Sequence, residues 1–360
     1  MEIDLIQFPI IFFSSLITTG AITPIMRKLA LSLNIVDLPD QAHKIHREPI
    51  PYLGGLAIIF GVVITVIGGS FLMGLNADAL KILISILVPS ILIGIIGLID
   101  DLKNLSPTLR LVAQSSAALI TWILIISGET LGTLTENFYI DFLITFLWIV
   151  GITNAINFFD NHDGGASGTI AISSLTLFIL SFASDQFYIA ALSLVLSGAC
   201  FGFLFWNKSP ARIYMGDAGS LFLGMVISTL AIRFDPTALN IWAGLALPIL
   251  LLALPMLDTS IVVISRIVRG TSPLQGGQDH LSHRLKRHGL TEKKTTLILW
   301  ADALFFCLLA IFVFFSSGSK QIFALLVGCI TWIWQFAWFF KLSHLDHGEK
   351  RNLNKNSRIT

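Results

Sequence analysis

The chain has 360 residues, of which 54% are hydrophobic and 12% charged, and its mean hydropathy is +0.81. Soluble domains carry about 25% charged residues, so this composition excludes an ordinary soluble enzyme and predicts an all-α polytopic membrane protein. The net charge of +1 gives no indication of a nucleic-acid partner.

Apolar stretches long enough to cross a bilayer occur eleven times, since a spanning helix requires about 20 mostly apolar residues. In chain order they lie near residues 5–26, 54–74, 80–99, 110–127, 138–153, 166–183, 187–206, 219–233, 239–265, 297–315 and 321–340. The fifth and eighth are short and the ninth is long. We predict a single transmembrane domain over residues 1–342, followed by a polar cytoplasmic tail over residues 343–360.

The distribution of basic residues predicts the orientation. If the N-terminus faces out, 20 of the 23 Lys and Arg fall on the inner side, and only Lys81, Arg233 and Lys320 fall outside. An even number of helices would mix the two sides, so we predict eleven spans with the N-terminus out and the C-terminus in. All eight histidines also fall on the inner side, which predicts an active site on cytoplasmic loops.

The first inner loop contains Lys44 and His46, which are candidate phosphate contacts. Farther along, Asp100 and Asp101 end the third apolar stretch on the inner side. A helix C-terminus disfavours negative charge, and Lys or Arg would end a spanning helix more favourably. Two adjacent carboxylates suit a divalent cation, or a base that acts beside one.

The next inner loop reads NAINFFDNHDGGASG, residues 154–168. Asn157, Asp160 and Asp163 are spaced by three, so a helical turn would bring them to one side. The glycines that follow allow a backbone to approach a ligand at the start of a helix. This pattern suits metal ligation and diphosphate binding. The alternative is a solvated loop with turn glycines, in which His162 faces water.

Asp217, in RIYMGDAGSLFLG, is expected to open the eighth helix, where it serves a ligand or merely caps the helix. Tyr214 would stack on a base or mark the membrane interface. Asp258 lies in an apolar stretch, where a charge at the bilayer centre costs about 2.5–3.5 kcal/mol. A structural ion pair with Arg266 or Arg269 would explain it.

The long inner loop, residues 266–295, carries His280, His283 and Arg284. The two histidines have a spacing that suits zinc, but no third ligand stands out. Arginine and histidine near a membrane face suit a phosphate or diphosphate better, although a positive inner loop explains part of this charge. Together the inner loops offer the carboxylates, amides and cations that Mg²⁺-assisted phosphoryl transfer requires, with a lipid phosphate as one substrate.

The chain resembles the polyprenyl-phosphate N-acetylhexosamine-1-phosphate transferases of glycosyltransferase family 4, a superfamily that includes phospho-N-acetylmuramoyl-pentapeptide transferase. The resemblance covers about residues 20–290. It depends on five ordered motifs: Lys-x-His…Ile-Pro-x-x-Gly-Gly at 44–55, GLIDDLKNLSP at 97–107, NAINFFDNHDGGASG, RIYMGDAGSLFLG, and PMLDTSIVVISRIVRGTSPL…DHLSHRL.

The resemblance implies transfer of N-acetylhexosamine-1-phosphate from a UDP-N-acetylhexosamine to undecaprenyl phosphate, with release of UMP and a requirement for Mg²⁺ or Mn²⁺. It implies a bacterial inner membrane, a cytoplasmic active site, a role in starting a cell-envelope polysaccharide, and a homodimer as one possible assembly. By motif, Asp217 would be the principal metal ligand, assisted by Asn157 and Asp160. Asp100, Asp101 and Asp160 would be the catalytic carboxylates. The remaining motif positions would bind substrate: Lys44, His46, Asn157, Asp163, Gly164, Tyr214, His280, His283 and Arg284.

Departures from the family pattern affect the expected sugar. Ser282 replaces the middle histidine of His-x-His-His-Arg, and Asn161, His162 and Gly165 depart from Asp-Gly-x-Asp-Gly. The first loop reads Pro-Ile-Pro-Tyr-Leu-Gly-Gly rather than the Thr-Pro-Thr-Met-Gly-Gly of the pentapeptide-transferring branch, which favours N-acetylglucosamine. The alternatives are the pentapeptide transferase and, in another class, a transporter, which would place polar residues at the membrane midplane beside broken helices.

Overall fold

A computed structural model describes residues 5–37, 49–73, 76–127, 137–236, 239–273 and 277–356, and this part of the chain is almost entirely helical. The helices are α1 (Gln7–Ser32), α2 (Gly54–Met73), α3 (Ala77–Lys103), α4 (Pro107–Ser127), α5 (Phe138–Phe159), α6 (Gly165–Ala183), α7 (Phe187–Asn207), α8 (Gly216–Arg233), α9 (Ile241–Leu251), α10 (Ala253–Val268), α11 (Leu281–Arg287), α12 (Glu292–Phe315) and α13 (Gly318–Asn356). Two short strands, β1 (Val36–Asp37) and β2 (Ile50–Pro51), pair antiparallel.

The protein is a multi-pass membrane protein, as predicted. In the described residues, nine helices are long and apolar enough to cross a bilayer, and the bent pair α9–α10 counts as a tenth candidate. Helices suit this environment because each satisfies its own backbone polar groups in lipid. Every predicted stretch corresponds to one helix or, for residues 239–265, to that bent pair.

Helix α8 is the one predicted span that is not among these candidates. It has 18 residues, with Asp217 in its first turn and Arg233 at its end, and its side chains are buried almost throughout. It packs against α2, α3 and α5, so protein rather than lipid surrounds it. The shortness of the predicted eighth span therefore reflects a central helix that the other helices enclose.

The long predicted stretch over residues 239–265 forms two helices, because the chain bends by 74° between α9 and α10. Pro255 has no N–H to donate to the carbonyl of Leu251, and its ring disfavours a continuous helix there. The Ser173 hydroxyl of α6 donates to that carbonyl oxygen at 2.7 Å. A neighbouring helix thus satisfies the backbone group that the break exposes.

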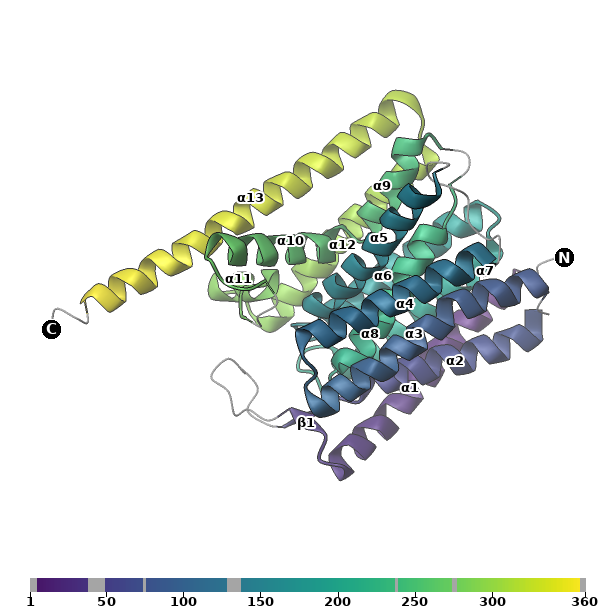
Figure 1. The fold of residues 1–360 in the computed structure, drawn as a ribbon, viewed down its shortest axis with the longest axis horizontal. Coiled ribbons are helices and arrows are strands. Elements are labelled where there is room, and N and C mark those ends of the chain that lie inside the picture. The colour runs from purple at the N-terminus through teal and green to yellow at the C-terminus, as the bar shows by residue number, and fades with distance from the viewer. Residues whose placement is uncertain are drawn as a thin grey trace.

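The connections with the polar motifs lie at one end of the helices. Figure 1 shows β1 and α11 toward this end, whereas the N-terminal end of the chain lies at the opposite end. The β1–β2 pair holds together the two ends of the first loop, in which Lys44 and His46 lie outside the described residues. Helix α11 lies in the predicted 266–295 loop, and α13 continues past residue 342, where we predicted that the tail begins.

The start of α2 is fixed against the turn that precedes α8. The backbone N–H groups of Gly54 and Gly55 donate to the carbonyl oxygens of Tyr214 and Met215 at 3.0 and 2.9 Å. A Cβ added at Gly55 would lie 2.2 Å from the Gly219 nitrogen. Only glycine permits this contact, and the contact sets the position of α8 at the polar end of the protein.

We expect Gly55→Ala to lower the free energy of unfolding by about 1–3 kcal/mol, because the added methyl group must push α2 away from α8. Gly68→Ala is the matched control in the same helix, since no atom lies within 4 Å of its added Cβ. Thermal unfolding of the detergent-purified variants measures both effects. Equal melting temperatures for the two variants would contradict the close contact.

Candidate active site

A cavity of about 840 Å³ lies at the polar end of the helices. Of the predicted site residues, it is lined by Asp100, Asp101, Asn157, Asp160, Asp163, Tyr214, Asp217 and His283. These residues come from four separate segments of the sequence. Asp37 adds a sixth aspartate, and Arg110 is the one arginine or lysine among the lining residues that the structure describes. The cavity is therefore strongly acidic.

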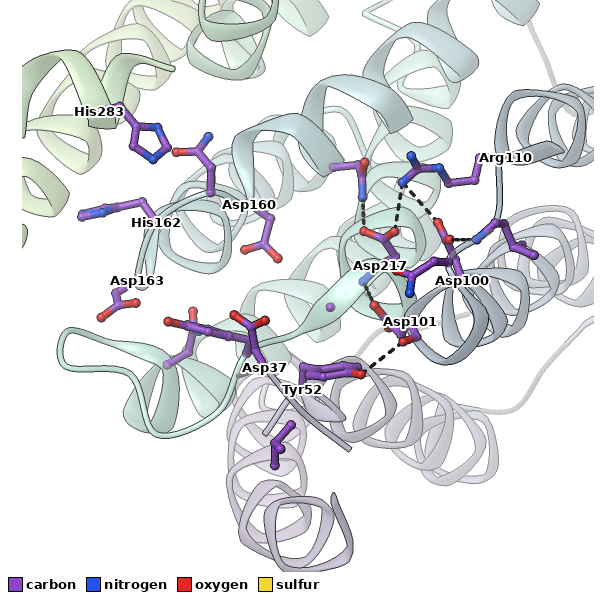
Figure 2. A pocket seen from close by; sticks show the side chains of 18 residues that line it. Asp37, Tyr52, Asp100, Asp101, Arg110, Asp160, His162, Asp163, Asp217 and His283 are labelled. Atoms are coloured by element: carbon purple, nitrogen blue, oxygen red, sulfur yellow. Dashed lines mark hydrogen bonds and ion pairs between the residues drawn. The ribbon is translucent and has the colours of Figure 1, made fainter. Parts of the chain in front are cut away.

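Asp217 projects from the first turn of α8 and meets two donors (Figure 2). Its Oδ1 accepts a hydrogen bond of 2.7 Å from Asn157 Nδ2, and its Oδ2 lies 3.2 Å from Arg110 Nη1. The same Arg110 nitrogen lies 3.2 Å from Asp100 Oδ2. A single guanidinium therefore bridges two carboxylates that belong to different helices.

Asp101 caps α8 from the end of α3. Its Oδ1 accepts from the Asp217 N–H at 2.8 Å, and its Oδ2 accepts from the Ala218 N–H at 3.1 Å. Gly216 has φ +68°, and a Cβ there would lie 2.6 Å from Asp101 Oδ2, so glycine is required for the approach. The alternative that Asp217 is the N-cap was wrong, because Asp101 supplies the capping oxygens.

Asp100 is buried beside this cap. Its Oδ1 accepts from the Leu105 N–H at 2.6 Å, and its side chain is 4% exposed. The dipole of α3 disfavours carboxylates at this end, but the N-terminus of α8 and the Arg110 guanidinium both compensate. The acidic pair is thus stabilised by its neighbours and not by its own helix.

Asp160 lies directly after α5, between the Asp217 group and the group formed by His162, Asp163 and His283 (Figure 2). Burial raises its pKa to about 8, and the negative charges of Asp217 and Asp163 contribute. A cation beside Asp160 would favour its ionised form. Asp160 can therefore contact a ligand that extends from the Asp217 group to the His283 group.

Asp163 and Tyr214 lie on one side of the cavity. Burial raises the pKa of Asp163, although the Ala211 N–H, which donates to its Oδ2 at 2.9 Å, opposes the shift. Burial and nearby negative charges raise the pKa of Tyr214, so its hydroxyl remains neutral. Buried Asn207 supports this region, because its Oδ1 accepts from the Gly164 N–H at 3.1 Å and its Nδ2 donates to the Ile213 carbonyl at 3.1 Å.

The glycines after Asp163 serve packing within the protein. The Gly164 carbonyl accepts from Trp300 Nε1 at 3.0 Å, and its N–H is bonded to Asn207. A Cβ at Gly168 would lie 2.2 Å from the same Trp300 nitrogen. Gly164 is not among the lining residues. These glycines therefore allow α12 to pack closely against the start of α6. The sequence had suggested that they allow a ligand to approach.

His162 does not face water, contrary to the alternative considered above. It is 8% exposed, its Nδ1 lies 2.8 Å from Glu292 Oε2, and its Nε2 lies 2.7 Å from Thr296 Oγ1. Glu292 also binds Lys286 Nζ at 3.0 Å. The next residue back, Asn161, accepts a hydrogen bond of 2.5 Å from the Ser282 hydroxyl. These contacts tie the 160–163 turn to α11 and α12.

Asp258 is fully buried and holds His280. Its Oδ2 lies 2.7 Å from His280 Nδ1, and its Oδ1 accepts from the Leu281 N–H at 2.6 Å. The predicted ion pair of Asp258 with Arg266 or Arg269 was therefore wrong. His280 is buried and does not line the cavity, but its ring lies 5.8 Å from that of His283. Burial lowers the pKa of His283 to about 3, with help from nearby cations, so His283 is neutral near pH 7.

Arg284 lies away from the cavity and has no exposed surface. Its guanidinium donates to the carbonyl oxygens of Asp279 and Phe339 at 2.8 and 2.6 Å and to Ser265 Oγ at 3.2 Å. With all three nitrogens engaged, it joins α11 to α10 and α13. The structure does not support the expected contact between Arg284 and a substrate phosphate.

Comparison with known proteins shows the family of the chain. The model of a family described as glycosyl transferase family 4 matches residues 83–235. A probable undecaprenyl-phosphate N-acetylglucosaminyl 1-phosphate transferase of Bacillus subtilis is 33% identical over 312 residues, which cover 85% of each chain. The chain belongs to glycosyl transferase family 4.

Two further relatives differ in the substrate that their names give. A decaprenyl-phosphate N-acetylglucosaminephosphotransferase of Mycolicibacterium smegmatis is 32% identical over 346 residues, 88% of this chain and 85% of that protein. A phospho-N-acetylmuramoyl-pentapeptide-transferase of Halalkalibacterium halodurans is 29% identical over 323 residues, 84% and 94% of the two chains. The family predicted from the motifs is therefore confirmed, and the chain is a transferase.

The sequence did not single out several polar residues that line this family 4 site, among them Arg110, Tyr52 and Asn207. Arg110 was counted only as an inner basic residue, although an arginine in the first turn of a helix is unfavourable and could have drawn attention. Tyr52, whose hydroxyl donates to the Asp101 carbonyl at 3.2 Å, and Asn207 carried no signal apart from proximity to motifs.

The loop that carries His280 and His283 is held by Asp279. Arg266 donates to both Asp279 oxygens, at 3.0 and 2.6 Å, and Arg269 Nη2 donates to Oδ2 at 2.6 Å. Burial alone would raise the pKa of Asp279, but these hydrogen bonds outweigh it and hold the pKa well below its usual range. The ion pair stabilises the fold above the unfolded pKa of about 3.9 and loses this contribution as the pH falls below that value.

We therefore expect Asp279→Asn to lower the free energy of unfolding at pH 7 by about 1.5–3 kcal/mol. The difference from the unmodified protein should shrink as the pH falls below about 4, because Asp279 of the unfolded chain then takes up a proton while the native ion pair keeps its charge. Asp78→Asn is the control, since Asp78 forms an exposed pair with Lys81 on α3. A destabilisation that is independent of pH down to 3 would contradict this account.

Proposed function

We propose that this protein transfers N-acetylglucosamine-1-phosphate from UDP-N-acetylglucosamine to undecaprenyl phosphate, releases UMP, and so initiates a cell-envelope polysaccharide. The observation that carries the proposal is the acidic cavity, which collects Asp217, Asn157 and the Asp100–Asp101 pair at one end of a membrane protein. A lipid phosphate and a water-soluble nucleotide can meet there. The names of the Bacillus and Mycolicibacterium relatives support this reaction.

The membrane in this proposal is the bacterial inner membrane, and the cavity faces the cytoplasm. The excess of Lys and Arg on the loops at the cavity end supports this orientation. UDP-sugars are cytoplasmic substrates, so the same orientation brings the donor to the cavity. Undecaprenyl phosphate would enter laterally from the lipid.

A divalent cation, Mg²⁺ or Mn²⁺, belongs to the proposal. In the described part of the chain, no three His, Cys, Asp or Glu side chains are grouped closely enough to hold a metal without help. Mg²⁺ is usually held by one or two carboxylates, with water and substrate phosphates as its other ligands. Asp217 and Asp160, with the Asn157 amide oxygen, fit such a site, and the cation would neutralise charge between the two phosphate-bearing substrates.

The remaining residues would bind and orient the reactants. Asp163 and Tyr214 would hold the uridine, and His283, as a neutral imidazole, would hydrogen-bond to a phosphate or sugar oxygen. An oxygen of the lipid phosphate attacks the phosphorus that carries the sugar, and the bond from that phosphorus to UMP breaks. Asp100 or Asp101 would orient the attacking phosphate. Asp101 already binds the N-terminus of α8, which leaves Asp100 as the better candidate.

The sugar is proposed from the first loop and from the relatives. The Pro-Ile-Pro-Tyr-Leu-Gly-Gly sequence favours N-acetylglucosamine, and the two most similar relatives reported above carry that sugar in their names. The relative named for the muramoyl-pentapeptide is 29% identical.

The test offers purified protein a panel of UDP-sugars with undecaprenyl phosphate and Mg²⁺, and follows UMP release. Turnover of UDP-N-acetylmuramoyl-pentapeptide, but not of UDP-N-acetylglucosamine, would reassign the donor.

We expect Asp217→Asn to reduce UMP release at least about a hundredfold, because an amide cannot supply the charge that neutralises a metal-bound transition state. Asp235→Asn, an exposed carboxylate after α8, is the control and should retain full activity. Wild-type turnover by Asp217→Asn at saturating Mg²⁺ would exclude Asp217 as a metal ligand.

Tyr214 should act on nucleotide affinity. We expect Tyr214→Ala to raise the KM for the UDP-sugar about tenfold with a smaller change in kcat, since base stacking on an aromatic ring contributes about 1–3 kcal/mol. Tyr214→Phe keeps the ring and serves as the matched control. If Tyr214→Phe were as impaired as Tyr214→Ala, the hydroxyl and not the ring would be responsible.

A further inference from the structure

The Arg110 guanidinium stands between the two carboxylates that matter most for the proposed site. Its Nη1 lies 3.2 Å from Asp100 Oδ2 and 3.2 Å from Asp217 Oδ2. The other Asp217 oxygen accepts from the Asn157 amide nitrogen. Both oxygens of Asp217 therefore point at hydrogen-bond donors, and Figure 2 shows this group as one connected set with Asp100.

This arrangement disfavours a cation on Asp217. The guanidinium at 3.2 Å takes up one lone pair of Oδ2, and its positive charge repels a divalent ion that approaches the others. The Asn157 amide would also have to present its oxygen in place of its nitrogen. The structure thus shows the carboxylates neutralised by the protein itself.

The Arg110 side chain is placed so that it can move away from Asp100 and Asp217. Its side chain is 31% exposed, whereas that of Asp100 is 4% exposed. It extends from the first turn of α4, where the helix dipole gives a cation no support. Asp100 cannot move as easily, because its other oxygen binds the Leu105 N–H and its helix is joined to α8 through Asp101. The mobile partner of the pair is therefore the arginine.

We propose that Arg110 is an internal stand-in for the divalent cation, which holds Asp100 and Asp217 together until a metal ion displaces its guanidinium. This inference rests on the proposed function only in its choice of Asp217 as the metal ligand. Displacement leaves the positive charge at the rim of the cavity. Metal binding then exchanges one cation for another, and the buried Asp100 and the partly buried Asp217 are never left without a counter-charge.

The first test measures Mn²⁺ binding to the full-length protein without nucleotide or lipid phosphate, by the electron paramagnetic resonance signal of free Mn²⁺. Arg110→Gln removes the competing cation, so we expect Mn²⁺ to bind about threefold or more tightly than to the wild type. Arg110→Lys keeps the charge and should stay closer to the wild type. Lys208→Gln, which removes an exposed charge near the same end, is the matched control and should bind as the wild type does. Unchanged or weaker binding by Arg110→Gln would overturn the proposal.

The second test uses the wild type alone, so a folding defect in a variant cannot obscure it. Phenylglyoxal modifies accessible guanidinium groups, and mass spectrometry reports the extent of modification at each arginine. We expect Mn²⁺ to increase the rate at Arg110 and to leave the rate at Arg212 unchanged. A rate at Arg110 that Mn²⁺ does not change, or lowers, would show that the guanidinium stays in place. Neither test uses a UDP-sugar, so failure of the proposed transferase activity and failure of this exchange are distinguishable.

Discussion

The interaction on which the site depends is the cap that Asp101 places on the N-terminus of α8. Two backbone N–H groups of α8 have no partner within their own helix, and the Asp101 carboxylate accepts both. The contact requires Gly216 in a left-handed conformation, because any Cβ would collide with that carboxylate. It fixes Asp217, the second residue of α8, against the end of α3. Together with the contact of Gly54 and Gly55 with the turn before α8, this cap sets where the polar end of the buried helix meets the cavity.

The cap also explains how six aspartates can share one cavity. Each helix end contributes a partial charge, and here the positive end of α8 meets the negative end of α3 together with its two carboxylates. Arg110 supplies the remaining positive charge in the described part of the site. Among the described residues no Lys or Arg pairs with Asp160, and burial with two negative neighbours raises its pKa to about 8. With six aspartates and one arginine among its lining residues, the described part of the cavity is deficient in positive charge from Asp100 to Asp160, and an added cation would stabilise it.

Much of the fold and of the cavity lining follows from the sequence alone. The apolar stretches are long, and lipid leaves a backbone few options besides a helix, so each predicted stretch is helical. Eight of the eleven predicted site residues that the structure describes line the cavity, because their loops lie at the same end of the helices. The sequence could not predict the hydrogen bonds between residues that are far apart in the chain, because these depend on which helices pack against each other. The Ser173 hydroxyl donates to the carbonyl that the break before Pro255 leaves without a partner. Asp101 caps α8, which lies more than 100 residues later in the sequence. Arg284 donates to the Phe339 carbonyl within the protein and does not face the cavity.

Asn161, His162 and Ser282, which depart from the family pattern, make side-chain hydrogen bonds within the protein. Asn161 and Ser282 are 121 residues apart, yet the Ser282 hydroxyl donates directly to Asn161. His162 is buried against Glu292 and Thr296, which extends the same connection into α12. Two unusual loops thus contact each other, and a change in one would leave a polar group of the other without its partner. Asn161 and His162 line the cavity together with Asp160 and His283, and in Figure 2 His162 and His283 lie on the other side of Asp160 from Asp217. The paired departures therefore lie in the cavity wall, where they supply hydrogen-bonding groups of their own.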